Sequence, residues 1–490
     1  MTSLPPPPNV LVVGAGVSGL TAARRLAAAG AVVTVVDAGD RVGGQIRTVD
    51  LADRRLEVGA EAVHLASPAV RALLAELGLA DDAVASGPGA TWLVTRRGLR
   101  RLPAGVGPSG PTQLGPVVRS GILGPLGLAR AALEPSIARR RVLGPDEDVD
   151  VRQFVAGRFG SQVADRFVDP MLGGLHSGDI NRLSLQSAAP RLLEVARSGR
   201  SLTLSRSARR SGPSVAPAAF VTWREGLERL PLALATGLDV RLRTRAHGLQ
   251  GVPGGYQVTL QTAASGEAGE GEEQVERFDA VVLACPATAA ADLVAPLVAD
   301  ADRAALAGQR FASVATVLLA FPRSVVDMRP ALRGTGIMLS STSGRLLKSA
   351  TFVSTKWPHQ RHSDLYFARL SAGRAGQDAA LDALDDDTLA GMLLADLADL
   401  TGVTTRPVER LVTRWPHTMP QLEVGHAGRL ARVRAALDGA GSNLGAHPIL
   451  LAGSSYDGVG LAAALASGEA AAASLLGERL TTSPTSASHR

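Results

Sequence analysis

The sequence predicts an α/β fold in which a Rossmann-like, dinucleotide-binding domain is assembled from distant parts of the chain. An apolar run at residues 10–13 leads through the glycine motif GAGVSG, residues 14–19, into a helix-favouring stretch at 20–29. A second apolar run, 31–36, ends in an acidic residue. A strand, glycine loop and helix pattern returns at residues 449–476. Strand, glycine turn, helix and acid in this order predict dinucleotide binding.

Each glycine of the first motif has a distinct steric role. Gly14 permits the tight turn, Gly16 lets the backbone approach a pyrophosphate, and Gly19 lets helix and strand pack closely. The N–H groups at the helix start then face the phosphates. Asp37 ends the second strand, where its carboxylate can accept hydrogen bonds from ribose hydroxyls. A glycine turn without a ligand is the alternative, and the flanking elements and the acid argue against it.

A second glycine pair, Gly43 and Gly44, distinguishes between dinucleotides. A nicotinamide site does not need this pair, whereas a flavin site of the glutathione-reductase type commonly has one, because the loop folds back over the dinucleotide. The sequence therefore favours FAD over NAD. Residues 56–61 form another strand and loop that could reach the cofactor, with Glu61 either facing it or solvated.

The C-terminal glycine loop is the second element predicted to face the cofactor. It contains Asp457, Val459 and Gly460 and leads into a helix that ends at Leu476. N–H groups at such a helix start can face an electron-rich ligand edge. We therefore predict that this loop holds the other end of the FAD and stabilises negative charge on the reduced flavin. A simple turn is the alternative.

The composition is that of an ordinary globular protein. The chain has 490 residues, 46% of them hydrophobic and 20% charged, which allows a large core and two or three domains. The net charge is +6, and Lys348 and Lys356 are the only lysines, so almost all cations are arginines. Arginine binds carboxylates bidentately, although GC-rich codon usage explains the bias equally well.

Several classes of site and location are excluded or disfavoured. Cys285 is the only cysteine, which rules out disulfides and cysteine-based metal clusters, and its place at the end of an apolar run predicts a buried, inert thiol. Residues 1–8 lack the features of a secretory signal, so we expect a cytoplasmic protein. Residues 459–476 are rich in Ala and Gly and carry Glu469, which predicts a packed helix instead of a membrane span.

The middle of the chain alternates between basic helical and strand-forming stretches. From Thr91 to Pro145 arginines are frequent and Glu134 is the only acid, and the Gly and Pro interruptions predict short helices with a basic, partly apolar surface. Apolar residues three or four apart predict a helix at 151–167. Further predictions are helices at 68–79 and 378–400, strands at 240–262, 277–283, 311–321 and 365–370, a polar hairpin at 265–276 and a flexible loop at 198–214.

These elements predict three domains and a tail. The boundaries are 1–90, 221–295 and 440–478 for a discontinuous FAD-binding domain of the glutathione-reductase type, 91–220 for a helical, basic inserted domain, 296–439 for an α+β substrate domain, and 479–490 for a disordered tail.

Longer motifs identify a family. They are FVAGRFG at 154–160, VDPMLGGLHSGD at 168–179, LS at 183–184, KWP at 356–358, RW at 414–415, PQ at 420–421, VGH at 424–426, GSSYDGVG at 453–460 and SG at 467–468. With residues 14–48, they resemble the flavin-dependent protoporphyrinogen and coproporphyrinogen III oxidases of haem synthesis, within the amine-oxidase-like FAD superfamily. The resemblance spans nearly the whole chain. The chain departs from the family pattern, which usually has Tyr, an aromatic residue, Gly and Glu, at His176, Leu422, Glu225 and Asp37.

The resemblance implies an enzyme that oxidises a porphyrinogen to a porphyrin in three two-electron steps, with non-covalent FAD and with dioxygen reduced to hydrogen peroxide. A hydride leaves a meso carbon for the flavin, so no general base is required and no catalytic residue is assigned beyond the candidates His176 and Lys356. No metal site is expected. Coproporphyrinogen III is the favoured substrate, because arginines would bind its additional carboxylates. Protoporphyrinogen IX is the alternative.

Other functions stay open on the same scaffold. An amine oxidase would require an aromatic cage beside the flavin, but aromatic residues make up only 3% of the chain. A carotenoid desaturase would require a long apolar tunnel and firmer membrane attachment. The non-enzymatic alternative is a flavin- or porphyrin-binding protein without catalytic activity. The expected partners are the porphyrinogen and dioxygen, with no nucleic acid. Peripheral membrane contact, homo-oligomerisation and hand-off to the next haem-pathway enzyme stay open.

Overall fold

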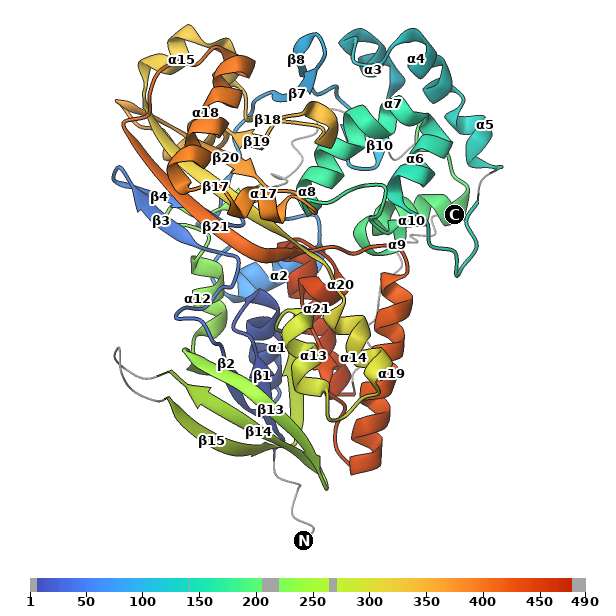
Figure 1. Cartoon of the computed structure of the whole chain (residues 1–490), viewed down its shortest axis with the longest axis vertical. Coiled ribbons are helices and arrows are strands. Elements are labelled where there is room, and N and C mark those ends of the chain that lie inside the picture. Colours follow the sequence, from blue (N-terminus) through green and yellow to red (C-terminus); the bar gives the residue numbers. More distant parts are fainter. Residues whose placement is uncertain (1–6, 141, 205–219, 264–270, 478–490) are drawn as a thin grey trace. The chain divides into compact units, whose positions relative to one another are not determined.

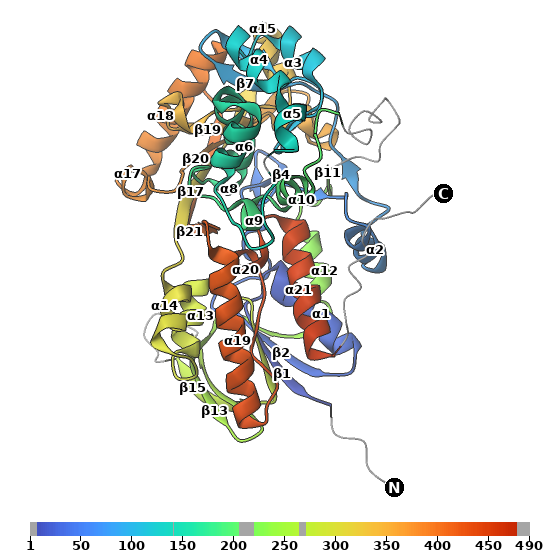
Figure 2. The same cartoon turned by 90° about the vertical axis from the view of Figure 1, so that its right-hand side faces the viewer.

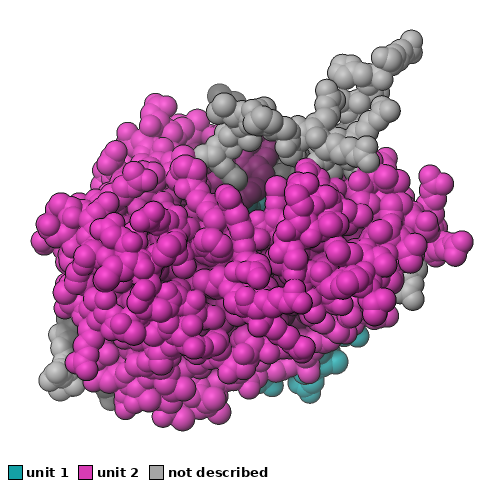
Figure 3. Space-filling model, turned by 90° about the horizontal axis from the view of Figure 1, so that it is seen from above, with its two compact units in different colours: residues 1–44, 230–308, 429–490 teal, residues 45–229, 309–428 magenta. Residues whose placement is uncertain are grey.

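Two compact units make up the computed structural model, which describes residues 7–140, 142–204, 220–263 and 271–477. Unit 1 comprises residues 1–44, 230–308 and 429–490, and unit 2 comprises residues 45–229 and 309–428 (Figure 3). Residues 45–90, assigned from the sequence to the FAD-binding domain, group with unit 2. The division into three domains stays a prediction. The expected tail at 479–490 and most of the expected loop at 198–214 lie outside the described residues.

A five-stranded parallel sheet forms the centre of unit 1. In spatial order its strands are β12 (Asp239–Arg241), β2 (Val32–Val36), β1 (Asn9–Val13), β16 (Ala280–Leu283) and β22 (Leu450–Leu451). The register places Val12 beside Val35 and Val282, and all three side chains are fully buried. Burial on both faces is expected of a parallel sheet. The predicted Rossmann-like sheet, built from distant segments, is therefore confirmed.

Helices α1 (Val17–Ala28) and α21 (Leu461–Leu475) lie side by side in both views of unit 1 (Figures 1 and 2). The two helices pack tightly at Gly468, where an added Cβ would lie 2.3 Å from the carbonyl oxygen of Ser18. The Ala- and Gly-rich stretch is thus a packed helix, as the sequence predicts. Within the described ranges, every helix is too short or too polar to cross a lipid bilayer.

An antiparallel sheet adds a second layer to unit 1. It contains β13 (Thr244–Val252), β14 (Gly255–Thr262) and β15 (Glu272–Phe278), and its apolar face shares a core with α13 (Ala287–Val294), α14 (Asp300–Ala307) and α19 (His426–Leu444). The hairpin expected at 265–276 is too long, because residues 272–276 already pair with β14. Their polar side chains are mostly exposed, as suits the edge of a sheet.

A seven-stranded sheet organises unit 2. In spatial order it contains β21 (Glu409–Pro420), β17 (Phe311–Pro322), β20 (Leu365–Ala372), β19 (Leu347–Thr351), β18 (Gly336–Met338), β7 (Thr91–Thr95) and β8 (Gly98–Arg101). The strands expected at 311–321 and 365–370 therefore belong to a separate sheet, as predicted. The expected helix at 378–400 is two helices, α17 (Asp378–Asp382) and α18 (Asp386–Thr401), because the carboxylate of Asp385 accepts from Thr388 N–H and starts a new helix.

Residues 91–111 differ from the sequence expectation. They form strands β7 and β8, followed by β9 (Val106–Gly107) and β10 (Gly110–Pro111), instead of short helices. Strand β7 pairs in parallel with β18, so its partner lies far away in the sequence. Local composition could not reveal this pairing, and the expected helices begin only at Leu114.

The helical part of unit 2 surrounds a core that includes Phe154, Phe159 and Phe167. Its helices are α3 (Leu114–Ser120), α4 (Pro125–Ala132), α5 (Glu134–Ala138), α6 (Val151–Phe159), α7 (Ser161–Val163), the π-helix η1 (Ala164–Gly173), α8 (Gly174–His176), α9 (Leu185–Ala188) and α10 (Pro190–Ser198). The helix expected at 151–167 is broken at Gly160, whose φ of +98° ends α6. A π-helix is rare and frequently marks a functional site.

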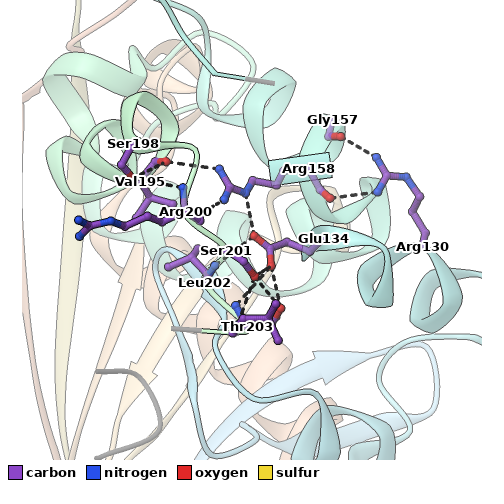
Figure 4. A network of polar contacts seen from close by, with 11 residues as sticks. Arg130, Glu134, Gly157, Arg158, Val195, Ser198, Arg200, Ser201, Leu202 and Thr203 are labelled. Carbon is purple, nitrogen blue, oxygen red and sulfur yellow. Dashed lines mark hydrogen bonds and ion pairs between the residues drawn. The ribbon is translucent and has the colours of Figure 1, made fainter. Parts of the chain in front are cut away.

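Glu134, the one acid of the arginine-rich stretch, is fully buried and organises the end of this helical part (Figure 4). Its carboxylate accepts from Arg158 Nε at 2.9 Å and from the backbone and side chain of Thr203. Arg158 also donates to the carbonyls of Val195 and Arg200. The ion pair and its hydrogen bonds therefore hold residues 200–203 close to helix α6.

Short elements complete the described chain. They are β3 (Thr48–Leu51), β4 (Arg54–Glu57), β5 (Val63–His64), β6 (Val84–Ala85), β11 (Phe220–Thr222), α2 (Pro68–Glu76), α12 (Arg229–Ala235), α15 (Ser324–Met328), α16 (Val353–Lys356), α20 (Ser454–Asp457) and the 3₁₀ turns η2 (Pro330–Arg333), η3 (Ser341–Ser343) and η4 (Pro358–Gln360).

Candidate functional site

The first glycine loop joins β1 to α1 in unit 1. Gly14 has a φ of +114°, and an added Cβ would lie 2.7 Å from the carbonyl oxygen of Ala284. At Gly19, an added Cβ would lie 2.0 Å from Gly14 O. Gly16 differs, because it precedes the first residue of α1 with an ordinary φ of −72° and has open space where its Cβ would be. Protein packing therefore requires two of these glycines, while the third leaves space at the helix start that a pyrophosphate could occupy.

Asp37 is tied to the glycine loop. Its Oδ2 accepts from Ala15 N–H at 2.7 Å, and its Oδ1 accepts from Gly39 N–H at 2.8 Å. A carboxylate has about four lone-pair positions, so both oxygens keep acceptor capacity for ribose hydroxyls. The carboxylate thus fixes the shape of the loop as well as offering the predicted ribose contact.

The second glycine pair folds back onto the first loop. Gly43 and Gly44 have φ values of +106° and +57°. Gly43 N–H donates to Ala15 O at 2.8 Å, and a Cβ added to Gly44 would lie 3.4 Å from Gly16 Cα. A side chain at Gly44 would therefore extend into the space beside Gly16, which fits a loop that covers a dinucleotide.

The C-terminal loop lies at the start of α21, the helix that packs on α1. Gly458 and Gly460 have φ values of +121° and +108°. Both oxygens of Asp457 are already bonded, one to Arg434 Nη2 at 2.8 Å and the other to Ser467 Oγ. The side chain of Asp457 therefore positions the loop, whose backbone at Val459 and Gly460 could contact the cofactor.

The side chain of Cys285 is unsuited to attack. Burial raises the pKa of its thiol to about 12, so the thiolate is scarce at neutral pH. This environment agrees with the inert thiol that the sequence predicts.

His176 lies at the end of the helical run that contains the π-helix. Its ring is buried, with Nε2 3.2 Å from Ala188 O and with no partner for Nδ1 among the described residues. Burial lowers the pKa of the imidazole to about 4, so the ring is neutral at physiological pH. Gln421 Nε2 donates to the carbonyl of His176 at 3.1 Å, which fixes the turn.

Lys356 belongs to a charged group around Glu61. Its Nζ lies 3.2 Å from Glu61 Oε2, and Arg369 Nη2 lies 2.8 Å from the same oxygen, while Trp357 Nε1 donates to Oε1 at 2.6 Å. Burial alone would raise the pKa of Glu61, but the two cations outweigh it and lower the pKa to about 2. Glu61 is therefore an ion-paired anion, not a solvated loop acid. Lys356 is held as its partner cation, which does not suit it to act as a base.

Beside this group lies a small cavity of about 20 Å³, room for about one water molecule. Glu57 lines it, and burial raises the pKa of this carboxyl to about 7, against hydrogen bonds from Leu227 N–H and Thr48 that lower it. Thr222 Oγ1 and Gln360 Oε1 are buried beside the cavity without a partner among the described residues. Sequence reasoning missed Glu57, because only its burial and its distant neighbours distinguish it from other acids.

Comparison with known proteins decides the family. The profile of the flavin containing amine oxidoreductases matches residues 17–476. The chain belongs to the flavin containing amine oxidoreductase family. As a member of the flavin containing amine oxidoreductases, it is an oxidoreductase with a flavin cofactor. The family assignment agrees with the glycine loops and the parallel sheet of unit 1.

Individual members of the family narrow the comparison. The chain is 33% identical to a coproporphyrinogen III oxidase of Mycobacterium leprae, over 93% of this chain and 95% of the relative. It is 28% identical to a coproporphyrinogen III oxidase of Bacillus subtilis, over 96% of this chain and 98% of the relative. A solved structure from Exiguobacterium sp. 255-15, named as a candidate protoporphyrinogen oxidase, has a TM-score of 0.79 at 24% identity and covers 97% of this chain and 99% of its own.

Proposed function

We propose that this flavoenzyme oxidises coproporphyrinogen III to coproporphyrin III in haem biosynthesis. The observation that carries the proposal is the near full-length similarity to the two bacterial proteins named coproporphyrinogen III oxidase. The reaction removes six electrons and passes them to three molecules of dioxygen, which leave as hydrogen peroxide.

The cofactor we propose is one non-covalent FAD in unit 1. Gly14, Gly16, Gly19, Asp37, Gly43 and Gly44 would hold its dinucleotide end, and the loop with Asp457, Val459 and Gly460 would hold its flavin end. Two features support this assignment: the open space at Gly16, and the fold-back of Gly44 towards it. The raised pKa of Cys285 supports a non-covalent flavin.

The chemistry that the bound flavin supplies is acceptance of a hydride from a meso carbon of the porphyrinogen. The protein's own residues then have to orient the macrocycle and exclude water, since no strong base is needed at that carbon. His176 is neutral and buried, and Lys356 is paired with Glu61, so both fit positioning roles better than proton abstraction.

Protoporphyrinogen IX is the second candidate substrate, because the Exiguobacterium neighbour carries that name. The two porphyrinogens differ at two positions, where coproporphyrinogen has propionates and protoporphyrinogen has vinyl groups. One buried bidentate contact between arginine and carboxylate would discriminate roughly tenfold or more in favour of the tetra-acid.

The test compares kcat/KM for the two porphyrinogens in the same detergent and salt, following hydrogen peroxide and porphyrin fluorescence together. We expect coproporphyrinogen III to be preferred. Equal values, or a preference for protoporphyrinogen IX, would remove the substrate assignment and leave a porphyrinogen oxidase. Oxidation of neither compound, in a protein that carries its flavin, would remove the porphyrinogen assignment altogether.

A further inference from the structure

Two cations of unit 2, Lys348 and Arg374, are buried without a direct ion pair among the described residues. Lys348 lies on β19, and Arg374 follows the end of β20 at Ala372, and each residue is 7% exposed. Lys348 Nζ donates to Ser177 Oγ, and Arg374 Nη2 donates to Leu339 O at 2.8 Å. Neither forms an ion pair with any residue that the structure describes, and Arg374 Nη1 is buried without a partner there. Uncompensated buried charge is costly, so this arrangement requires an explanation.

The acid whose charge acts on Arg374, Asp169, is also incompletely bonded. Asp169, on the π-helix η1, is 3% exposed and accepts at Oδ2 from Ser340 Oγ at 2.8 Å and from Ser341 N–H at 2.7 Å. Its Oδ1 has no partner among the described residues, although its charge favours the protonated form of Arg374. Asp169 therefore balances one of the two cations and leaves the other without compensation.

The turn after the π-helix connects these groups. Ser177 adopts a φ of +48°, and its carbonyl accepts from Ala375 N–H at 2.7 Å while its hydroxyl accepts from Lys348. A non-glycine residue with positive φ is uncommon and persists where the surroundings hold it in place. We call Asp169, Ser177, Lys348 and Arg374 the Lys348 cluster.

The charge of the Lys348 cluster depends on its lysine. Burial, together with the repulsion of Arg374 and Arg369, lowers the pKa of Lys348 to about 7. Of these neighbours, Arg369 is paired with Glu61, and Arg374 is balanced by Asp169. With Lys348 protonated, the cluster carries one uncompensated positive charge, and an incoming monoanion would neutralise it.

We propose that Lys348 and Arg374 bind one carboxylate of the porphyrinogen substrate. The inference rests on the proposed function, which supplies a ligand with several carboxylates. Neither the ammonium group of Lys348 nor the free guanidinium nitrogen of Arg374 has a negatively charged acceptor among the described residues. A carboxylate would supply one to both donors. Asp169 limits the site to one carboxylate, because a second anion would leave the cluster with net negative charge.

The binding of this carboxylate is coupled to a proton. Above the pKa of free Lys348 the amine is mostly neutral, and a bound carboxylate favours its protonated form, so the complex takes up a proton at pH 8. At pH 6 the lysine is already charged, so binding of the carboxylate is accompanied by little proton uptake. Affinity for the carboxylate therefore falls as pH rises from 6 to 8.

The test uses the flavin-loaded protein and coproporphyrin III, the stable fluorescent product, as the binding probe. The variants are Lys348→Met, Lys348→Arg, which keeps a positive charge, and the control Arg119→Met, which removes an exposed cation from α3 in the same unit. Dissociation constants are measured at pH 6 and pH 8, and calorimetry in two buffers of different ionisation enthalpy counts the protons taken up.

For the wild type we expect binding that weakens several-fold between pH 6 and pH 8, with proton uptake at pH 8. Lys348→Met should weaken binding roughly tenfold at pH 6 and abolish both the pH dependence and the proton uptake. Lys348→Arg should retain most affinity without the pH dependence, and Arg119→Met should behave as wild type. In turnover, Lys348→Met should raise KM more than it lowers kcat.

Unchanged affinity and unchanged proton uptake in Lys348→Met would overturn the carboxylate site. A different result would contradict the proposed function, namely a wild-type protein that oxidises neither porphyrinogen. If Lys348→Met does not fold, Lys348→Arg still decides the matter, because loss of the proton uptake with retained affinity supports the site, and retained uptake contradicts it.

Discussion

At the scale of single residues, Gly16 offers the sharpest separation between folding and cofactor binding. Its φ is ordinary and its Cβ position is open, so Gly16→Val should fold while it fills the space assigned to the pyrophosphate. We expect the purified variant to have lost most of its flavin absorbance, with far-UV circular dichroism unchanged.

Gly14→Ala is the contrasting variant for that experiment. Its added Cβ would meet Ala284 O at 2.7 Å, and its φ of +114° disfavours any side chain, so it should fail to fold stably. Full flavin content in Gly16→Val would show that the loop does not bind the cofactor.

Glu61 gives a second prediction at this scale. Its folded pKa of about 2 lies below the ordinary value of 4.5, so its ionisation stabilises the fold above pH 4.5 and this contribution is lost as pH falls towards 2. Glu61→Gln should reduce the free energy of unfolding at pH 7 by about 2 to 4 kcal/mol, because Lys356 and Arg369 lose their shared anion.

Urea denaturation at pH 7 and at pH 3 measures the effect of Glu61→Gln, which should shrink at the lower pH. Asp81→Asn, at an exposed carboxylate, is the control and should change stability by less than about 1 kcal/mol. An equal effect of Glu61→Gln at both pH values would mean that the loss of stability does not come from the charge of Glu61.

At the scale of elements, helix α6 carries one buried and one exposed ion pair, which allows a matched comparison. Arg158 and Glu134 are almost fully buried, whereas Arg152 and Asp165 are 36% and 41% exposed. Arg158→Met should cost about 3 to 5 kcal/mol, because it leaves Glu134 charged in the core, and Arg152→Met less than about 1 kcal/mol. Chemical denaturation measures both, and similar costs would contradict the importance of burial.

The start of α21 is the element that we assign to the flavin end of the cofactor. Gly460 has a φ of +108°, so Gly460→Val would distort the turn that presents the helix N–H groups. We expect a lower flavin reduction potential or loss of the flavin, measured by spectroscopic titration. Ala462→Val is the control, since it places the same side chain in the first turn at a helical position. An unchanged potential with full flavin occupancy would contradict the assignment.

Elements also show where sequence reasoning succeeds and where it fails. Residues 9–36 could be predicted because strand, glycine turn and helix follow one another, so the pattern is local. Strand β7 could not, because its pairing partner Gly336–Met338 is distant in the chain. The same reason hides the environment of Glu61, whose partners Lys356 and Arg369 come from the other segment of unit 2. The sequence shows that Lys348 is one of two lysines, but it does not show that this lysine is buried.

At the scale of the whole molecule, family and function rest on features that persist across nearly the full length of the chain. The glycine loops of unit 1 explain why the flavin family could be predicted from sequence. The proposed carboxylate site could not be predicted in this way, because only the fold brings the surroundings of Lys348 and Arg374 together.

The strand order of unit 1 has a consequence for biosynthesis. The sheet needs β22 at Leu450–Leu451, and helix α21 packs on α1 only after residue 475 has been made. A chain emerging from the ribosome therefore carries strand β16 with an open edge until residues 450–451 have been made. Contacts between the proposed cofactor and the loop at 457–460 can form only after that loop has been made, and a chain truncated before β22 would expose the edge of β16 to aggregation.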